Sequence, residues 1–191
     1  MRIIGGAAGG RRLAVPSRGT RPTSDRTREA LFSTLASLCG QWSGVRVVDL
    51  YAGSGAFGLE ALSRGAAEAA FVERDRSALR VLQANVDAVG LPGATVMPGD
   101  VDDVVSRRCD RPFDIAFLDP PYALPLERVT DVLRLMSEKG WLARGAVVVV
   151  ERDAREGREP WPDQGWEPVR QRDYGDTALW YGRFLGPRQA E

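Results

Sequence analysis

The sequence predicts an α/β fold with a mostly parallel sheet of seven strands and an antiparallel pair at its C-terminal end. Between residues 45 and 153, short apolar runs rich in β-branched residues alternate with segments of helical periodicity. This alternation is typical of βα units whose strands are covered on both faces. Residues 166–185 have no helical period and indicate two long strands that turn at Gly175-Asp176, a hairpin signal. Right-handed crossovers then give a doubly wound sheet.

The first elements precede this alternation. Residues 2–16, RIIGGAAGGRRLAVP, indicate two short strands around a glycine-rich turn. A helix follows, capped at one of residues 23–25, with Leu31, Leu35 and Leu38 on one face. We therefore expect a short β-hairpin and helix before the main sheet.

The alternating region supplies the other parallel strands and helices. Glycine residues at 65, 90 and 140 mark helix ends, where a left-handed conformation is common. Predicted strands cover residues 45–52, 69–75, 94–100, 113–119 and 145–153, and predicted helices cover residues 57–65, 77–90, 101–108 and 126–140.

Composition bounds the function. The chain has 191 residues, 43% of them apolar, which suits one domain with its own core. Histidine is absent, which excludes His-based triads, His general bases and His metal ligands. Cys39 and Cys109 have no metal-like spacing, and we expect no metal site. No apolar run has the length of a membrane helix, and the first residues lack a signal-peptide pattern, so we expect a cytoplasmic protein with no membrane partner.

Charge is unevenly distributed along a chain of zero net charge. Residues 1–46 contain eight arginines and two acidic residues, a net charge of +6, and the remainder is correspondingly acidic. A basic arm on an acidic body indicates an anionic partner, although a solvated tail gives the same pattern. We predict a basic extension over residues 1–43, a main domain over residues 44–185 and a flexible tail over residues 186–191.

A glycine loop follows the first strand of the main domain. Gly53-x-Gly55-x-x-Gly58 is compatible with a dinucleotide site, but this pattern alone is weak. Asp49 stands just before the loop, where a carboxylate would repel a pyrophosphate and attract a cationic ligand. Glu73 ends the second strand, where an acid accepts the two ribose hydroxyls. Together they favour a nucleoside with a positively charged amino-acid tail, which is S-adenosylmethionine.

These residues resemble the class I methyltransferases, whose Rossmann-like fold matches the predicted sheet. The resemblance covers the acid before the glycine loop, Glu73, and the Gly99-Asp100 pair after the third strand. It implies that Asp100 accepts from the adenine amino group, while capping of the following helix is an equal alternative. The implied cofactor-binding residues are Asp49, Ala52, Gly53, Gly55, Glu73, Arg74, Asp100 and Val101.

The segment Asp119-Pro120-Pro121-Tyr122 follows the fourth strand at the edge where ligands bind. Two prolines fix the backbone and remove N–H donors, so the segment presents a carboxylate and carbonyl oxygens as a rigid set of acceptors. Such a set suits an NH₂ group, and Tyr122 offers a flat face for a base. The motif resembles that of amino-nitrogen methyltransferases acting on adenine N6, guanine N2 or glutamine amide. The aspartate favours a nucleobase, which must be flipped out of its stack.

The N-terminal half narrows the resemblance. RIIGG, GRRL, RPTSDRTREALFSTL and DLYAGSGAFGLEALSRGA are similar to the RsmD-type 16S ribosomal RNA guanine-N2 methyltransferases, over residues 2–185. The resemblance implies a guanine of 16S rRNA in the small ribosomal subunit or an assembly intermediate as substrate, catalysis by Asp119, Pro120, Pro121 and Tyr122, and a monomer. Arg11 and Arg12 are expected to contact the RNA, and the resemblance implies that Arg21, Thr23, Arg26 and Arg28 face the RNA or the mouth of the active site.

Two alternatives remain open at this point. An adenine-N6 methyltransferase has the same fourth-strand motif, and a non-catalytic RNA-binding assembly factor would have the same fold. For Arg28, an ion pair with Asp25 one helical turn earlier is an alternative to an RNA contact.

Overall fold

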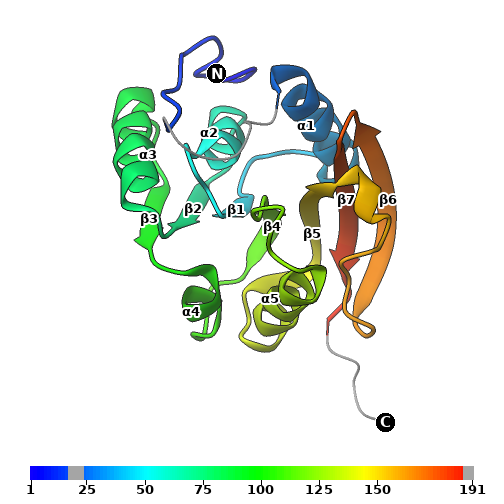
Figure 1. The fold of residues 1–191 in the computed structure, drawn as a ribbon. Coiled ribbons are helices and arrows are strands. Elements are labelled where there is room, and N and C mark those ends of the chain that lie inside the picture. Colours follow the sequence, from blue (N-terminus) through cyan, green and yellow to red (C-terminus); the bar gives the residue numbers. More distant parts are fainter. Residues whose placement is uncertain (17–23, 187–191) are drawn as a thin grey trace.

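Seven strands form one sheet in the order β3-β2-β1-β4-β5-β7-β6 (Figure 1). The computed structural model describes residues 1–16 and 24–186. Neighbouring strands among the first five are parallel, whereas β7 pairs antiparallel with β5 and with β6. The strands are β1 (Arg46–Leu50), β2 (Glu68–Glu73), β3 (Ala94–Pro98), β4 (Phe113–Leu118), β5 (Leu142–Asp153), β6 (Trp166–Tyr174) and β7 (Thr177–Phe184). The predicted fold class is confirmed.

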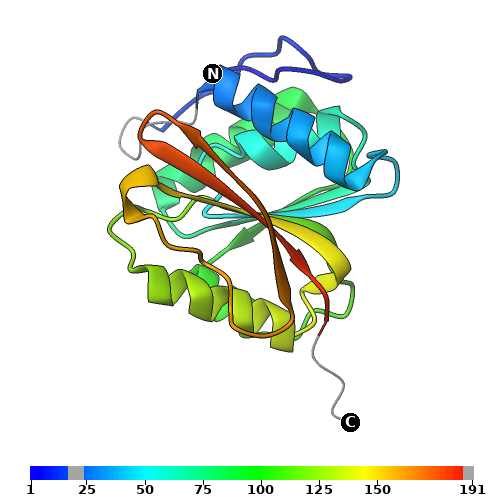
Figure 2. The ribbon, with the colours of Figure 1, turned by 90° about the vertical axis from the view of Figure 1, so that its right-hand side faces the viewer.

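Helices cover both faces of this sheet (Figures 1 and 2). One face packs against α1 (Asp25–Cys39), α2 (Ala56–Ser63) and α3 (Arg76–Val89). The other face packs against α4 (Val101–Val105) and α5 (Leu126–Glu138), and a short 3₁₀ turn, Ala154–Glu156, follows β5. Successive residues of a strand point to opposite faces, so Val47 belongs to the first core and Val48 to the second. The apolar runs of the sequence reflect this burial on two sides.

The C-terminal hairpin turns where the sequence predicts. Tyr174 pairs with Thr177, so the connection has two residues, Gly175 and Asp176. Gly175 has φ of 63°, the left-handed conformation that such a turn requires of its first residue. The hairpin extends the sheet beyond β5 and places Thr177 beside the segment that follows β4.

The predicted N-terminal hairpin is present in a short form. Residues 2–16 contain one antiparallel bridge, between Arg2 and Arg12. The N–H groups of Ile3 and Leu13 donate across the turn to the carbonyls of Arg11 and Met1 at 2.9 and 3.0 Å. The turn also bonds to α2, because the N–H groups of Ile4 and Gly5 donate to the Glu60 carboxylate at 2.6 and 2.9 Å. These bonds hold the short hairpin against the helix.

Helix α1 begins as expected and belongs to the main core. Ser24 caps it by accepting from the backbone N–H of Thr27. Leu31, Phe32 and Leu35 are buried in the same cluster as residues of β1, β4 and β5. The largest differences from the expected bounds of the main domain are three residues: α4 ends at residue 105 instead of 108, and β5 begins at residue 142 instead of 145.

Gly58 is predicted to be essential for the contact between α2 and β2. A Cβ atom at this position would lie 2.3 Å from Cε1 of the buried Phe71. Gly58→Ala should therefore lower the free energy of unfolding by about 1–3 kcal/mol, measured by urea denaturation. Phe71→Leu in the same chain should recover part of this loss because it removes the obstructing ring. Equal stability of Gly58→Ala and the wild type would contradict this role.

Candidate active site

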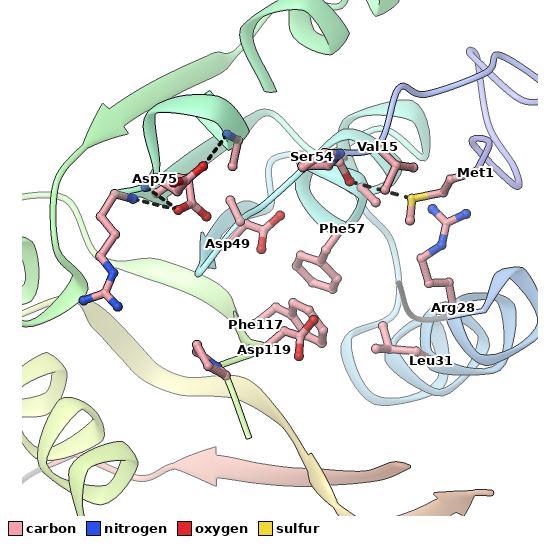
Figure 3. Close-up of a pocket in the computed structure, with 17 residues that line it drawn as sticks. Met1, Val15, Arg28, Leu31, Asp49, Ser54, Phe57, Asp75, Phe117 and Asp119 are labelled. Carbon is pink, nitrogen blue, oxygen red and sulfur yellow. Dashed lines mark hydrogen bonds between the residues drawn. The ribbon is translucent and has the colours of Figure 1, made fainter. Parts of the chain in front are cut away.

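The candidate site is a pocket of about 450 Å³ at the carboxyl ends of β1, β2 and β4 (Figure 3). Four acidic side chains reach it: Asp49 near the end of β1, Glu73 at the end of β2, Asp75 at the start of α3 and Asp119 after β4. Its lining consists of Met1, Val15, Pro16, Arg28, Leu31, Asp49, Ala52, Ser54, Ala56, Phe57, Glu73, Arg74, Asp75, Ala78, Phe117, Asp119 and Pro121. We call it the edge pocket.

The glycine loop forms one wall of the edge pocket. Gly55 precedes α2 with φ of 77°, and a Cβ atom there would also lie 2.4 Å from Cδ1 of Leu82. Gly53 has φ of 54°, and its N–H donates to Glu73 Oε2 at 2.9 Å. The neighbouring Ala52 and Ser54 line the pocket, whereas Gly53 and Gly55 shape the turn behind them. The loop thus brings its backbone close to any ligand without filling the space.

Asp49 is a buried carboxyl with one protein donor. It is 2% exposed, and its only hydrogen bond within the described residues comes from the Gly58 N–H at 3.0 Å. Burial raises the pKa of Asp49 well above its ordinary range, and the nearby Glu73 carboxylate adds to this effect. A cationic ligand in the edge pocket would favour its charged form, so the residue fits a ligand that carries an amine or a sulfonium.

Glu73 is held in a fixed orientation at the pocket wall. Its Oε2 accepts from the Gly53 N–H, and its Oε1 accepts from the N–H groups of Arg74 and Asp75 at 2.9 and 2.8 Å. These bonds join the end of β2 to the glycine loop. Oε1 already accepts two of these bonds, whereas Oε2 accepts one and retains acceptor capacity for a ligand hydroxyl.

Asp100 lies beside the edge pocket and does not line it. It caps α4 by accepting from the Asp102 N–H at 3.1 Å, which matches the capping alternative. Arg74 donates to the other oxygen of Asp100 at 2.8 Å, and this bond lowers the pKa of the carboxyl. Val101 is the buried first residue of α4. Contacts of Asp100 and Val101 with adenine stay a prediction.

The Asp119–Tyr122 segment forms another wall of the edge pocket. Asp119 and Pro121 line the pocket, Pro120 is buried, and Tyr122 is 45% exposed with its hydroxyl 3.3 Å from Thr177 Oγ1. Burial raises the pKa of Asp119 well above its ordinary range, and the nearby Glu151 and Asp49 carboxylates raise it further. The Pro121 carbonyl accepts from Leu124, but no hydrogen bond within the described residues occupies the Pro120 carbonyl. Among the described residues, the Asp119 carboxyl therefore faces the pocket and the adjacent Pro120 carbonyl has no hydrogen-bond partner.

A buried arginine that the sequence analysis missed supports this segment. Arg152 is 1% exposed, donates to the Leu124 carbonyl at 2.8 Å and pairs with Glu156 on the 3₁₀ turn. It thus ties the loop after Tyr122 to the end of β5. The only sequence signal is the charged pair Glu151-Arg152 directly after four valines of a predicted buried strand.

The N-terminal segment forms another wall of the edge pocket, which the sequence did not indicate. The Met1 sulfur accepts from the Ser54 hydroxyl at 3.8 Å, and Val15 and Pro16 line the same pocket. Asn85 on α3 holds this segment by bonding to both the N–H and the carbonyl of Ala14. No motif in the sequence marks Met1 or Asn85 for this role.

The predicted RNA-contacting arginines take different positions. Arg12 and Arg26 are exposed, and Arg11 donates to the carbonyls of Ala88 and Val89 at the end of α3. Arg28 is buried and donates to Asp25 Oδ1 at 2.8 Å, the ion-pair alternative. Arg21 and Thr23 lie outside the described residues. Within residues 1–16 and 24–186, no helix could span a membrane and no group of side chains is arranged to hold a metal ion.

Comparisons with known proteins agree with this geometry. The family model described as Conserved hypothetical protein 95 matches residues 1–183. Ribosomal RNA small subunit methyltransferase D of Escherichia coli (strain K12) is 37% identical over 179 residues, which are 93% of this chain and 87% of that protein. The solved structure of yhhF from Escherichia coli has a TM-score of 0.84 and 34% identity, and the match covers 96% of this chain and 97% of that one.

The fold likeness extends to more distant proteins. SMU.776, solved in complex with SAH, has a TM-score of 0.63 and 16% identity, over 78% of this chain and 47% of that one. This likeness concerns the fold alone. The chain belongs to the Conserved hypothetical protein 95 family, a family of S-adenosylmethionine-dependent methyltransferases with a Rossmann-like sheet.

Proposed function

We propose that this chain transfers a methyl group from S-adenosylmethionine to the exocyclic N2 amine of a guanine in 16S rRNA. One observation carries the proposal: the Asp119 carboxyl lines the same edge pocket as Asp49 and Glu73. Cofactor and acceptor amine can therefore meet at one place. The relative named Ribosomal RNA small subunit methyltransferase D supports the substrate class.

The described residues fit the cofactor. Glu73, fixed by three backbone donors, would accept from the ribose hydroxyls. Asp49, buried with one protein donor, would neutralise the amino group and face the sulfonium. When bound, S-adenosylmethionine supplies an electrophilic methyl group on a positively charged sulfur. A nicotinamide dinucleotide fits less well because the Asp49 carboxylate would lie beside its negatively charged pyrophosphate.

The protein's contribution to the reaction is to position the amine. An exocyclic amine is a weak nucleophile because its lone pair is delocalised into the ring. The Asp119 carboxylate and the Pro120 carbonyl would each accept one N–H, which directs the lone pair of nitrogen toward the methyl carbon. Nitrogen would bond to the methyl carbon as the C–S bond breaks, S-adenosylhomocysteine would leave, and the methylated amine would release its proton to water. Catalysis of this kind depends on orientation and on prearranged electrostatics.

Recognition of the base and of the RNA uses other side chains. Tyr122 is sufficiently exposed to stack on a flipped base. The exposed Arg12 and Arg26 belong to the basic N-terminal region and would contact phosphates. The small ribosomal subunit, or an intermediate of its assembly, is the proposed partner, with a monomer acting in the cytoplasm. Adenine N6 is the second candidate acceptor, because Asp119 and Pro120 would hold either amine.

A transfer assay tests the proposal. Radiolabelled S-adenosylmethionine is incubated with the protein and with small ribosomal subunits, naked 16S rRNA, duplex DNA or total protein in separate reactions. Label is expected in the rRNA, best in the assembled particles. Transfer only to DNA or protein would contradict the substrate class. Binding of cofactor without any transfer would favour the non-catalytic assembly factor.

Glu73→Ala is predicted to weaken cofactor binding strongly. The variant loses charge-assisted bonds to the ribose, worth about 1.5–3 kcal/mol, and also loosens the glycine loop. Calorimetry with S-adenosylhomocysteine should show at least about tenfold weaker binding. Asp75→Asn removes the same charge two residues away and keeps the cap of α3, so it should cause a smaller loss. Unchanged affinity of Glu73→Ala would remove this residue from the site.

A further inference from the structure

Arg28 carries hydrogen-bond donors that the protein leaves unused. Its side chain on α1 is buried, and the residue is 4% exposed. Nη2 donates to Asp25 Oδ1 at 2.8 Å and to the Arg2 carbonyl at 2.5 Å. Nε and Nη1 are buried and have no hydrogen-bond partner within the described residues. Buried donors without a partner destabilise the fold, and a bound ligand that accepts from Nε and Nη1 would remove this cost.

The position of Arg28 indicates the kind of ligand. Arg28 lines the edge pocket, in which four lining side chains are carboxyls. The other lining arginine, Arg74, is exposed and bonds to Asp100. Arg28 is therefore the one buried cation among the described lining residues. In Figure 3, Arg28 and Asp75 lie at opposite ends of the pocket, with Asp49 between them.

We propose that Arg28 binds the carboxylate at the amino-acid end of S-adenosylmethionine, an inference that rests on the proposed function. With the ribose at Glu73 and the cationic groups near Asp49, the amino-acid end extends toward Arg28. A carboxylate placed beside Asp49, Glu73, Asp75 or Asp119 would meet like charge once these groups are ionised. At Arg28 it gains charge-assisted hydrogen bonds from Nε and Nη1.

An RNA phosphate is a poorer candidate for the same donors. A phosphate belongs to a large duplex or loop, which cannot easily reach a residue that is 4% exposed. A small carboxylate inside the pocket reaches it directly. Arg28 is thus assigned to the cofactor, and the exposed arginines of the N-terminal region keep the role of contacting RNA.

The test compares two ligands that differ only in the carboxylate. Calorimetry is performed with S-adenosylhomocysteine and with S-adenosyl-3-thiopropylamine, which lacks this group. The wild type should bind S-adenosylhomocysteine at least about tenfold more tightly. In Arg28→Gln this preference should disappear, because only the ligand with the carboxylate loses a partner. Arg80→Gln, which removes an exposed arginine of α3, should retain the full preference.

Several outcomes would overturn the inference. Equal binding of both ligands by the wild type would show that the carboxylate has no partner. A full preference for S-adenosylhomocysteine in Arg28→Gln, with weakened rRNA binding, would assign Arg28 to a phosphate. If the wild type binds neither ligand, the proposed function itself fails. If circular dichroism shows that Arg28→Gln is unfolded, Arg28→Lys replaces it, because lysine keeps the charge with fewer donors. Arg28→Lys should show a reduced preference for S-adenosylhomocysteine, and an unchanged preference would contradict the assignment.

Discussion

Asp119→Ala is expected to lower turnover by about 10²–10³-fold, the loss typical of removing one prearranged partner of the transition state. The affinity for S-adenosylhomocysteine should change little, because the lost interaction acts on the attacking amine. Single-turnover methyl transfer to small ribosomal subunits measures the first quantity, and calorimetry measures the second. Loss of cofactor affinity in parallel with turnover would instead assign Asp119 to the cofactor.

Asp119→Asn provides the matched control for charge. Asparagine keeps an acceptor oxygen of the same size, so its turnover should lie between those of the wild type and Asp119→Ala. The pKa of Asp119 is raised by burial and by the carboxylates of Glu151 and Asp49, and it is lowered in part by Arg152. Only the ionised carboxylate both accepts an N–H bond and stabilises the positive charge that develops on the amine. The turnover of the wild type should therefore fall as the pH decreases through this raised pKa. Asp119→Asn should lack that acidic limb.

Asp49→Asn is expected to stabilise the protein while it damages cofactor binding. Burial raises the pKa of Asp49 above its unfolded value, so the stability that the protonated carboxyl provides is present at low pH and is lost as the pH rises through the folded pKa. Asparagine carries no charge, and its oxygen can still accept from the Gly58 N–H. At alkaline pH, where the wild-type carboxyl must be charged inside the protein, both the free energy of unfolding and the Tm of Asp49→Asn should be higher than those of the wild type.

Asp49→Asn should also weaken the binding of the cofactor. The cationic end of the cofactor loses its buried carboxylate, so the affinity for S-adenosylmethionine should fall at least about tenfold. The gain in stability should shrink as the unfolding experiment is repeated toward pH 4, where Asp49 in the wild type is protonated. A destabilised Asp49→Asn at pH 8 would show that the carboxylate stabilises the apo fold.

Much of the fold was predictable because its signals are local. The runs of valine in β5 and the Gly175-Asp176 turn specify strands from their own residues. The position of the N-terminal hairpin against α2 was not predictable in this way. It depends on Glu60 and Ser63, which accept from backbone groups more than fifty residues away in sequence. No pattern in residues 2–16 marks a segment whose partner is a distant helix.

The same distinction holds for the site. Asp49, Glu73 and Asp119 stand at strand ends, and parallel strands bring their carboxyl ends to one edge, so their meeting could be predicted. For Arg28 the sequence left three roles open: contact with RNA, a position at the mouth of the active site, and an ion pair with Asp25. Its burial arises from the packing of α1 against the sheet and from Asp25. Arg152 likewise bonds to the loop after Tyr122 only because the fold brings the end of β5 next to the segment that follows β4.

The identity of the methylated nucleoside tests the central claim most directly. Small ribosomal subunits labelled by the wild-type protein are digested to nucleosides, which are separated and identified by mass spectrometry. The acceptor pair at Asp119 and Pro120 predicts label on an exocyclic amine, and the proposed substrate narrows it to N2-methylguanosine. N6-methyladenosine as the product would agree with transfer to an exocyclic amine and would contradict guanine as the acceptor base. A 2′-O-methylated nucleoside or a C5-methylated pyrimidine would contradict the role assigned to Asp119.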